Sequence, residues 1–153
     1  MRCSTLYKKN VIEQDEARRM YEFLKWNICW EEGVRSKKGF TRKAKPLNFG
    51  DIKEVDDVIK KALSKITDKA YNVGFIYLNY YEDGNMWCPN HTHKGTHQFV
   101  ISLGEERVLN VGKKEYKMGN GDVILFGSSL HGVPKSDTTK GRIAIAVFME
   151  PIF

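Results

Sequence analysis

Histidines are the residues of this 153-residue chain best suited to binding a metal, and three of its four lie within "NHTHKGTHQFVISLG". The fourth is His131, in "SSLHGVPKS". Imidazole is a common ligand for iron, zinc and copper. In a strand alternate residues point to the same side, so we expect His91 and His93 to face one point in space. The sequence predicts a metal site formed by His91, His93 and, from a later strand, His131.

His97 has the same parity as this pair, but it opens "HQFVISLG", which is typical of a core strand. We expect it to be a hydrogen-bonding or core histidine rather than a metal ligand.

The elements that must position these residues change character near residue 70. Apolar residues at helical spacing predict helices over 13–27 and 51–67, and Asp51 with Glu54 resembles a capping box at the second. The later half predicts short strands separated by glycines, an antiparallel sandwich or barrel backed by helices. We expect a mostly β, α+β fold and one domain, 1–153, with 1–70 as helical N-terminal support and 71–153 as the β core. The predicted strands are 73–81, 97–104, 107–112, 114–119, 122–127 and 142–149.

Composition favours a water-soluble protein with one core, because 41% of the residues are hydrophobic and 29% are charged. No run of about 20 apolar residues is present, so no membrane span is expected. The first ten residues lack an apolar stretch of secretory type. Three widely spaced cysteines fit neither a disulfide framework nor a Cys-x-x-Cys zinc site. A reducing, cytoplasmic location is therefore expected.

Positive charge is concentrated in one stretch of the chain. The net charge is +6, and "RSKKGFTRKAK", residues 35–45, holds six cations and no acid. The stretch is either a solvated loop or a loop that contacts phosphates, since Lys and Arg gain free energy there by releasing counterions. The second reading makes nucleic acid a possible partner. Its contact residues would be Arg35, Lys37, Lys38, Arg42, Lys43 and Lys45.

These motifs, in this order, resemble the AlkB-like branch of the Fe(II)/2-oxoglutarate dioxygenases. "FIYLNYYEDGNMWCPNHTH" is similar to that family's Asn-x-Tyr strand, acidic-Gly turn and first metal histidine. "VISLGEERVL" and "GDVILF" resemble two of its core strands, and "HGVPKSDTTKGRIAIAVFM" resembles its second metal histidine, Val-Pro and Arg-Ile strand. The resemblance covers about residues 40 to 149 and implies a double-stranded β-helix, a jelly-roll barrel of two four-stranded sheets.

The resemblance also implies cofactors and roles. His91 and His131 would bind Fe(II), Arg142 would pair with the distal carboxylate of 2-oxoglutarate, and Asn79 and Tyr81 would donate hydrogen bonds to the same cosubstrate. Molecular oxygen would be consumed, and 2-oxoglutarate would be decarboxylated to succinate as a substrate C–H bond is oxidised. The implied substrate is a modified base in nucleic acid, hydroxylated or demethylated, or a related compound.

Two positions depart from the family pattern. His93 stands where the family normally has Asp or Glu, and Phe148 stands where it has a second arginine. A site of two histidines and one carboxylate holds Fe(II) at a net charge of about +1, whereas three neutral imidazoles leave the full +2. We expect the three-histidine site to attract an anionic cosubstrate strongly and to reach higher oxidation states less readily.

Two alternatives remain open. The chain also resembles the cupins, whose first motif places His-x-His and then Glu where this chain has His97, and whose thiol dioxygenases include three-histidine iron sites. That resemblance implies a cupin-like three-histidine dioxygenase. The departures at His93 and Phe148 equally fit a non-catalytic module that keeps the barrel and its metal. Neither the substrate nor the oligomeric state follows from the sequence.

Overall fold

The computed structural model describes residues 4–33, 35–36 and 39–152. Two helices, α1 (Gln14–Asn27) and α2 (Lys53–Ile66), lie in the first half of these residues. The strands in the first half are β1 (Leu6–Lys8), β2 (Glu31–Glu32), β3 (Arg35–Ser36), β4 (Gly39–Phe40) and β5 (Lys43–Asn48). Those in the second half are β6 (Tyr71–Tyr81), β7 (Cys88–His91), β8 (His97–Gly104), β9 (Arg107–Val111), β10 (Lys114–Met118), β11 (Val123–Phe126), β12 (His131–Val133) and β13 (Arg142–Pro151).

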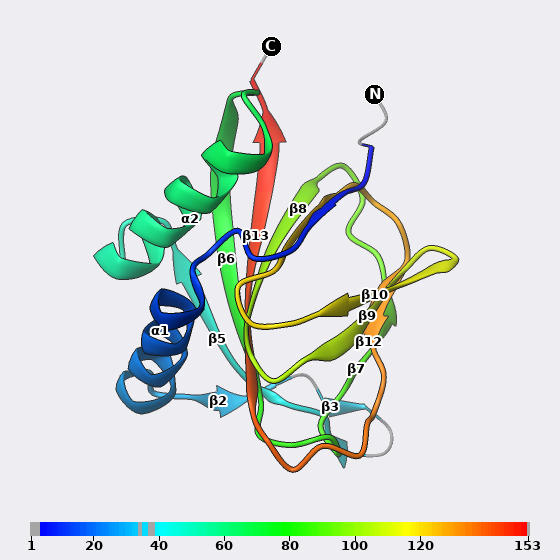
Figure 1. Cartoon of the computed structure of the whole chain (residues 1–153). Coiled ribbons are helices and arrows are strands. Elements are labelled where there is room, and N and C mark those ends of the chain that lie inside the picture. The colour runs from blue at the N-terminus through cyan, green and yellow to red at the C-terminus, as the bar shows by residue number, and fades with distance from the viewer. Residues whose placement is uncertain (1–3, 34, 37–38, 153) are drawn as a thin grey trace.

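The strands from β6 onward form two facing layers (Figure 1). One layer has the order β11-β8-β13-β6 within a larger sheet, the other has the order β10-β9-β12-β7, and every recorded pairing is antiparallel. Consecutive strands thus alternate between the sheets, apart from the β9–β10 hairpin. This arrangement is a double-stranded β-helix, so the predicted fold class is confirmed.

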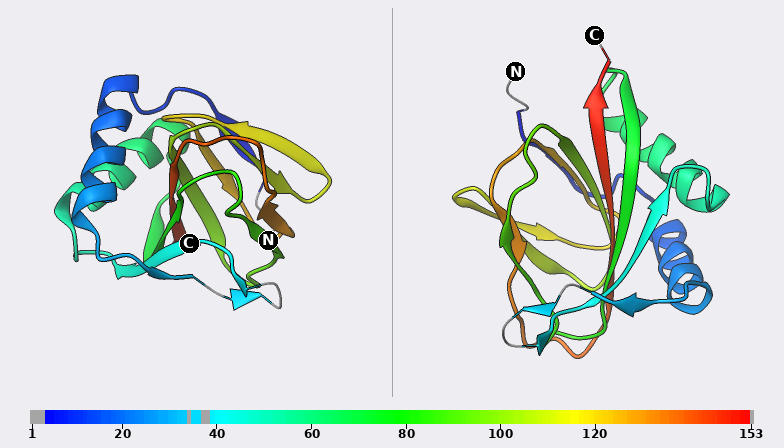
Figure 2. Two further views of the ribbon diagram at one scale, coloured as in Figure 1. Left: turned by 90° about the horizontal axis from the view of Figure 1, so that it is seen from below. Right: turned by 180° about the vertical axis from the view of Figure 1, so that it is seen from behind.

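Period-two alternation divides the large sheet between two cores. Along β13, Ile143, Ile145 and Val147 face the helices, whereas Ala144 and Ala146 face the small sheet. Helices α1 and α2 lie side by side on the outer face of the large sheet (Figure 2). The inner face is left for the second core and for the cavity that holds the site.

The N-terminal part contributes strands as well as the predicted helices. β1 pairs with β11 at one edge of the four-stranded layer, and β5 pairs with β6 at the other, which extends the large sheet. Strands β1 and β5 thus belong to the large sheet itself.

The capping box predicted at α2 is not formed. Ile52 is the N-cap residue, and no side chain caps the helix. The Asp51 carboxylate instead accepts a hydrogen bond from the backbone N–H of Asn48, at 2.9 Å. The turn before the helix uses this acid, because Asp readily accepts backbone hydrogen bonds in turns.

Neither helix of the described residues has the length and apolar character needed to cross a membrane.

Candidate metal centre

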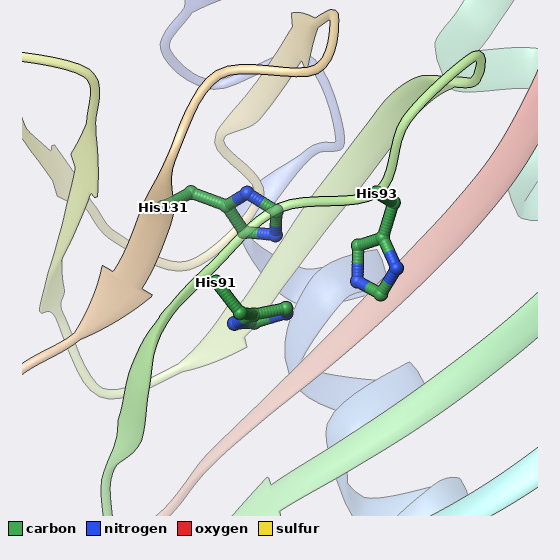
Figure 3. A group of neighbouring side chains, drawn as sticks. All are labelled: His91, His93 and His131. Carbon is green, nitrogen blue, oxygen red and sulfur yellow. The ribbon is translucent and has the colours of Figure 1, made fainter.

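The three predicted ligands meet at one point between the sheets. His91 ends β7, His131 begins β12, and these two residues are directly paired in the small sheet. Their ring centroids lie 4.3 Å apart, and those of His91 and His93 lie 4.8 Å apart. One nitrogen from each ring falls within 4.8 Å of the others, and the rings converge in Figure 3. This spacing suits a shared metal ion.

His93 reaches the site from a loop, which corrects the predicted reason for its position. β7 ends at His91, so strand alternation does not place His93 beside it. The loop after β7 turns the His93 ring inward, where it lies edge-to-face against Phe148 with centroids 4.8 Å apart.

Backbone carbonyls fix the tautomers of two of the histidines. Nδ1 of His91 lies 2.8 Å from the carbonyl oxygen of Pro89, and Nδ1 of His131 lies 2.9 Å from that of Ser129. Because a carbonyl only accepts, each Nδ1 carries the proton and donates it. The Nε2 lone pairs are therefore available for a metal, the arrangement that typically orients histidine ligands.

The surroundings keep most of this cluster neutral. Burial lowers the pKa of His131 to about 4, and burial also lowers the pKa of His93. The pKa of His91 is raised, mainly by its contact with the thiol of Cys88, 3.7 Å from Nδ1, and also by the Pro89 carbonyl. Neutral imidazole is the metal-binding form, so His93 and His131 are ready to bind near pH 7.

The histidines open onto a cavity of about 410 Å³ between the two sheets. Its floor is the inner face of β6, β8 and β13, and its roof includes β7 and β12. The described lining residues include two arginines and no Asp or Glu. A metal held here would keep its full charge, and the cavity as a whole favours an anion.

Arg142, Tyr81 and Asn79, the predicted cosubstrate residues, all line this cavity. The Arg142 side chain is fully buried, and its Nε donates to Ser102 Oγ at 2.9 Å. Its Nη2 has no hydrogen-bond partner among the described residues. A buried unpaired guanidinium N–H is costly, and burial lowers the pKa of Arg142. A carboxylate in the cavity would satisfy it, so these residues fit 2-oxoglutarate.

The other two predicted cosubstrate residues are held as hydrogen-bond donors. Asn79 Oδ1 accepts from Arg42 Nε at 2.6 Å, which leaves the Asn79 Nδ2 hydrogens for a ligand. The guanidinium carbons of Arg107 and Arg142 lie 5.2 and 5.4 Å from the centroid of the Tyr81 ring. Burial raises the pKa of Tyr81 to about 12, so its hydroxyl keeps its proton.

Three cations of the basic stretch, Arg42, Lys43 and Lys45, have side chains that the structure describes, and each of them has a partner or lies in the cavity. Arg42 is 6% exposed and lines the cavity, which differs from the solvent-facing role expected of it. Lys43 pairs with Glu82 at 3.1 Å, and Lys45 pairs with Glu31 at 3.5 Å. Lys37, Lys38 and the side chain of Arg35 lie outside the described residues.

Arg42, expected in a loop that contacts phosphates, instead lines the cavity. The sequence signal that could have placed it there is strand alternation, because Arg42 is two residues before the buried Ala44 of β5 and so has the same parity.

His97 lies apart from the three-histidine cluster. Its Nδ1 is 3.3 Å from the hydroxyl oxygen of Tyr71, and it does not belong to the group that can share a metal. The prediction that it is a hydrogen-bonding histidine is confirmed. The cupin motif therefore loses the ligand that it would place at this position.

Comparisons with known proteins agree with the architecture. HygX from Streptomyces hygroscopicus, solved with nickel and 2-oxoglutarate bound, gives a TM-score of 0.75 at 11% identity over 97% of this chain and 83% of that one. A 2OG-Fe(II) oxygenase family oxidoreductase from Burkholderia pseudomallei gives a TM-score of 0.67 at 12% identity, over 95% of this chain and 84% of that one. OsALKBH1 gives a TM-score of 0.68 at 16% identity, over 97% of this chain and 99% of that one.

No family model matches the sequence, and no curated protein matches it. At these identities the structural similarity establishes the fold. The chain therefore has the fold of the 2-oxoglutarate and Fe(II) oxygenases, as its motifs predicted.

Proposed function

We propose that this protein is an Fe(II)- and 2-oxoglutarate-dependent oxygenase. One observation carries the proposal: three metal-competent imidazoles and a buried guanidinium with an unpaired N–H line the same cavity. The first group suits a divalent metal, and the second suits the far carboxylate of a dicarboxylate. Bound together, iron and 2-oxoglutarate supply the activation of oxygen and the oxidation of a C–H bond.

The residues of the chain hold and orient these groups. His91, His93 and His131 would hold the metal, and three protein ligands would leave it free to bind exogenous ligands as well. Arg142, whose Nη2 has no partner among the described residues, would pair with the distal carboxylate, and Asn79, held by Arg42, would donate from its amide. The apolar residues between the sheets limit water in the cavity, which strengthens these electrostatic contacts.

A modified base in nucleic acid is the substrate implied by the AlkB resemblance, and it remains a proposal. The fold shared with OsALKBH1 supports it only at the level of architecture. The ion pairs of Lys43 and Lys45 reduce the free positive charge available to phosphates. A nucleic-acid strand whose phosphates are bound weakly would have to be held mainly through the base in the cavity.

A non-catalytic metal-binding module is the second candidate, and the three-histidine site is the observation that favours it. Without a carboxylate ligand, the metal keeps a charge that disfavours its oxidation while still attracting 2-oxoglutarate.

Spectroscopy of the Fe(II)-loaded protein, followed by product analysis, tests the proposal. Fe(II) and 2-oxoglutarate are added without oxygen, and we expect the visible charge-transfer band of a chelated keto acid. On admission of oxygen we expect succinate. His131→Ala should abolish both the bound iron and the band, whereas His97→Ala, which changes a histidine outside the cluster, should retain them.

Three outcomes would contradict the proposal, each in a different way. A band without succinate under all conditions would identify the non-catalytic module. Iron binding without 2-oxoglutarate binding would favour the cupin-like reading. Full iron occupancy in His131→Ala would show that His131 is not a metal ligand, which would contradict the proposed metal centre.

A further inference from the structure

The cavity floor changes character along its length. At one end of β13, Arg142 lies opposite Tyr81, and six residues later Phe148 lies opposite Phe75. The inward positions between them on β13 are Ala144 and Ala146. At about 3.3 Å per residue, the guanidinium row and the aromatic row are about 20 Å apart along the strand. The site therefore has a cationic end and an aromatic end.

The aromatic end is adjacent to the metal cluster and reaches solvent. The ring centroid of Phe148 is 5.5 Å from that of Phe75 and 4.8 Å from that of His93. Tyr77 extends the group, with its centroid 6.0 Å from that of Phe75. Phe75 is 39% exposed, so this end is accessible. A planar ring placed there would stack beside a candidate metal ligand.

A buried amide without a partner lies in the same row. Gln98 is directly opposite Phe148 in the sheet, is 2% exposed and lines the cavity. Its Nε2 has no hydrogen-bond partner among the described residues. A buried donor without a partner destabilises the fold, and an acceptor on a ligand would satisfy it.

Charge limits the kind of ring. Arg42 and Arg142 line the cavity, its described lining has no carboxylate, and the candidate metal site has no acidic ligand. A cationic ring would find no carboxylate among the described lining residues to offset its charge. On the basis of the proposed function, we propose that the row of Phe75, Tyr77, Phe148 and Gln98 is the substrate subsite. It binds a planar, uncharged aromatic ring that presents a hydrogen-bond acceptor.

Three matched probes test this subsite by NMR titration of the nickel-loaded protein with 2-oxoglutarate. Benzamide has both the ring and the acceptor, benzamidine has the same shape with a positive charge, and cyclohexanecarboxamide has the acceptor without the aromatic ring. We expect benzamide to bind at least about tenfold more tightly than benzamidine and about fivefold more tightly than cyclohexanecarboxamide.

Variants assign the binding to the named residues. Phe148→Leu should weaken benzamide about fivefold, whereas Phe49→Leu, which removes a ring packed against α2, should have no effect. Gln98→Met should weaken benzamide about fivefold and leave toluene binding unchanged. Equal binding of benzamide and benzamidine would overturn the proposal, and so would equal effects of the two phenylalanine variants in folded protein.

Repeating the titration without metal and 2-oxoglutarate separates this inference from the proposed function. If nickel and 2-oxoglutarate fail to bind but benzamide still prefers the wild-type subsite, the subsite stands and the oxygenase proposal falls. If nickel and 2-oxoglutarate bind but benzamide shows no preference for the wild-type subsite, only the subsite proposal is contradicted. Competition by thymidine and by a short single-stranded oligothymidylate then distinguishes a free ring from a base within a strand.

Discussion

Arg142 is a buried cation that lacks a hydrogen-bond partner on one of its nitrogens. Its guanidinium is fully buried, keeps one hydrogen bond to Ser102 and leaves Nη2 without a partner among the described residues. Burying a charge without a counter-charge destabilises a fold, and because Arg142 lines the cavity, an anionic ligand there could supply the missing partner.

Replacing this charge should therefore separate binding from stability. In Arg142→Met we expect the affinity for 2-oxoglutarate to fall at least about tenfold, since a charge-assisted pair contributes about 1.5–3 kcal/mol. Metal affinity should be retained, and the ligand-free melting temperature should hold or rise. Calorimetry with 2-oxoglutarate and thermal melts measure both. Unchanged 2-oxoglutarate affinity would show that Arg142 does not hold the cosubstrate.

At the scale of elements, the short strands β7 and β12 decide where the metal ligands lie. Arg107, on the neighbouring β9, donates to the carbonyl oxygens of Met86 and Pro134, at 2.8 Å in each case. These carbonyls belong to the segments just before β7 and just after β12. One buried arginine thus ties together the two strands that carry His91 and His131.

The close approach of these strands depends on Gly132. A Cβ at this position would lie 2.8 Å from the carbonyl oxygen of Cys88 and 2.9 Å from the backbone nitrogen of Asn90. Gly132→Ala should therefore push β12 away from β7, destabilising the protein by about 1–3 kcal/mol and weakening metal binding.

Gly74→Ala is the matched control, because its Cβ would meet only the Phe148 carbonyl oxygen, at an ordinary 3.6 Å. Denaturant melts and metal titration measure both effects. Normal metal affinity in Gly132→Ala would show that the close approach of β12 to β7 does not determine metal binding.

At the scale of the whole molecule, metal binding and protonation act on the same cluster. The folded-state pKa of His131, about 4, is below its usual 6.5, so between these values the unfolded chain binds a proton that the folded chain does not. The contribution of His131 to stability is complete above pH 6.5 and is lost as the pH falls through 4. His93 acts in the same direction, and His91 acts in the opposite one.

We therefore expect the metal-free protein to melt at lower temperature as the pH falls from 7 to 4, with a smaller decrease in His131→Gln. At pH 7, a metal at 100 times its dissociation constant should stabilise the fold by about 2.7 kcal/mol, and a chelator should reverse this. Calorimetric scans with and without metal provide the measurement. Identical pH profiles for wild type and variant would contradict the buried, neutral state of His131.

The sequence by itself determined the order of elements and the chemistry available. Short apolar runs separated by glycines, such as 97–104 and 142–149, indicated strands. In the structure one face of each packs against the helices and the other faces the cavity. The spacing of the histidines indicated a bound metal, and the Arg-Ile motif indicated a bound carboxylate. These inferences are local, since they depend on residue type and spacing along the chain.

Only the tertiary structure decided which side chains share a space. His93 enters the cluster from a loop, where strand periodicity says nothing of direction, and Arg42 comes from a separate segment to hold Asn79. The edge-to-face contact of Phe148 with His93 and the unpaired amide of Gln98 likewise arise between segments distant in sequence. Contacts of this kind are set by sheet order and packing against remote residues, and no local pattern encodes them.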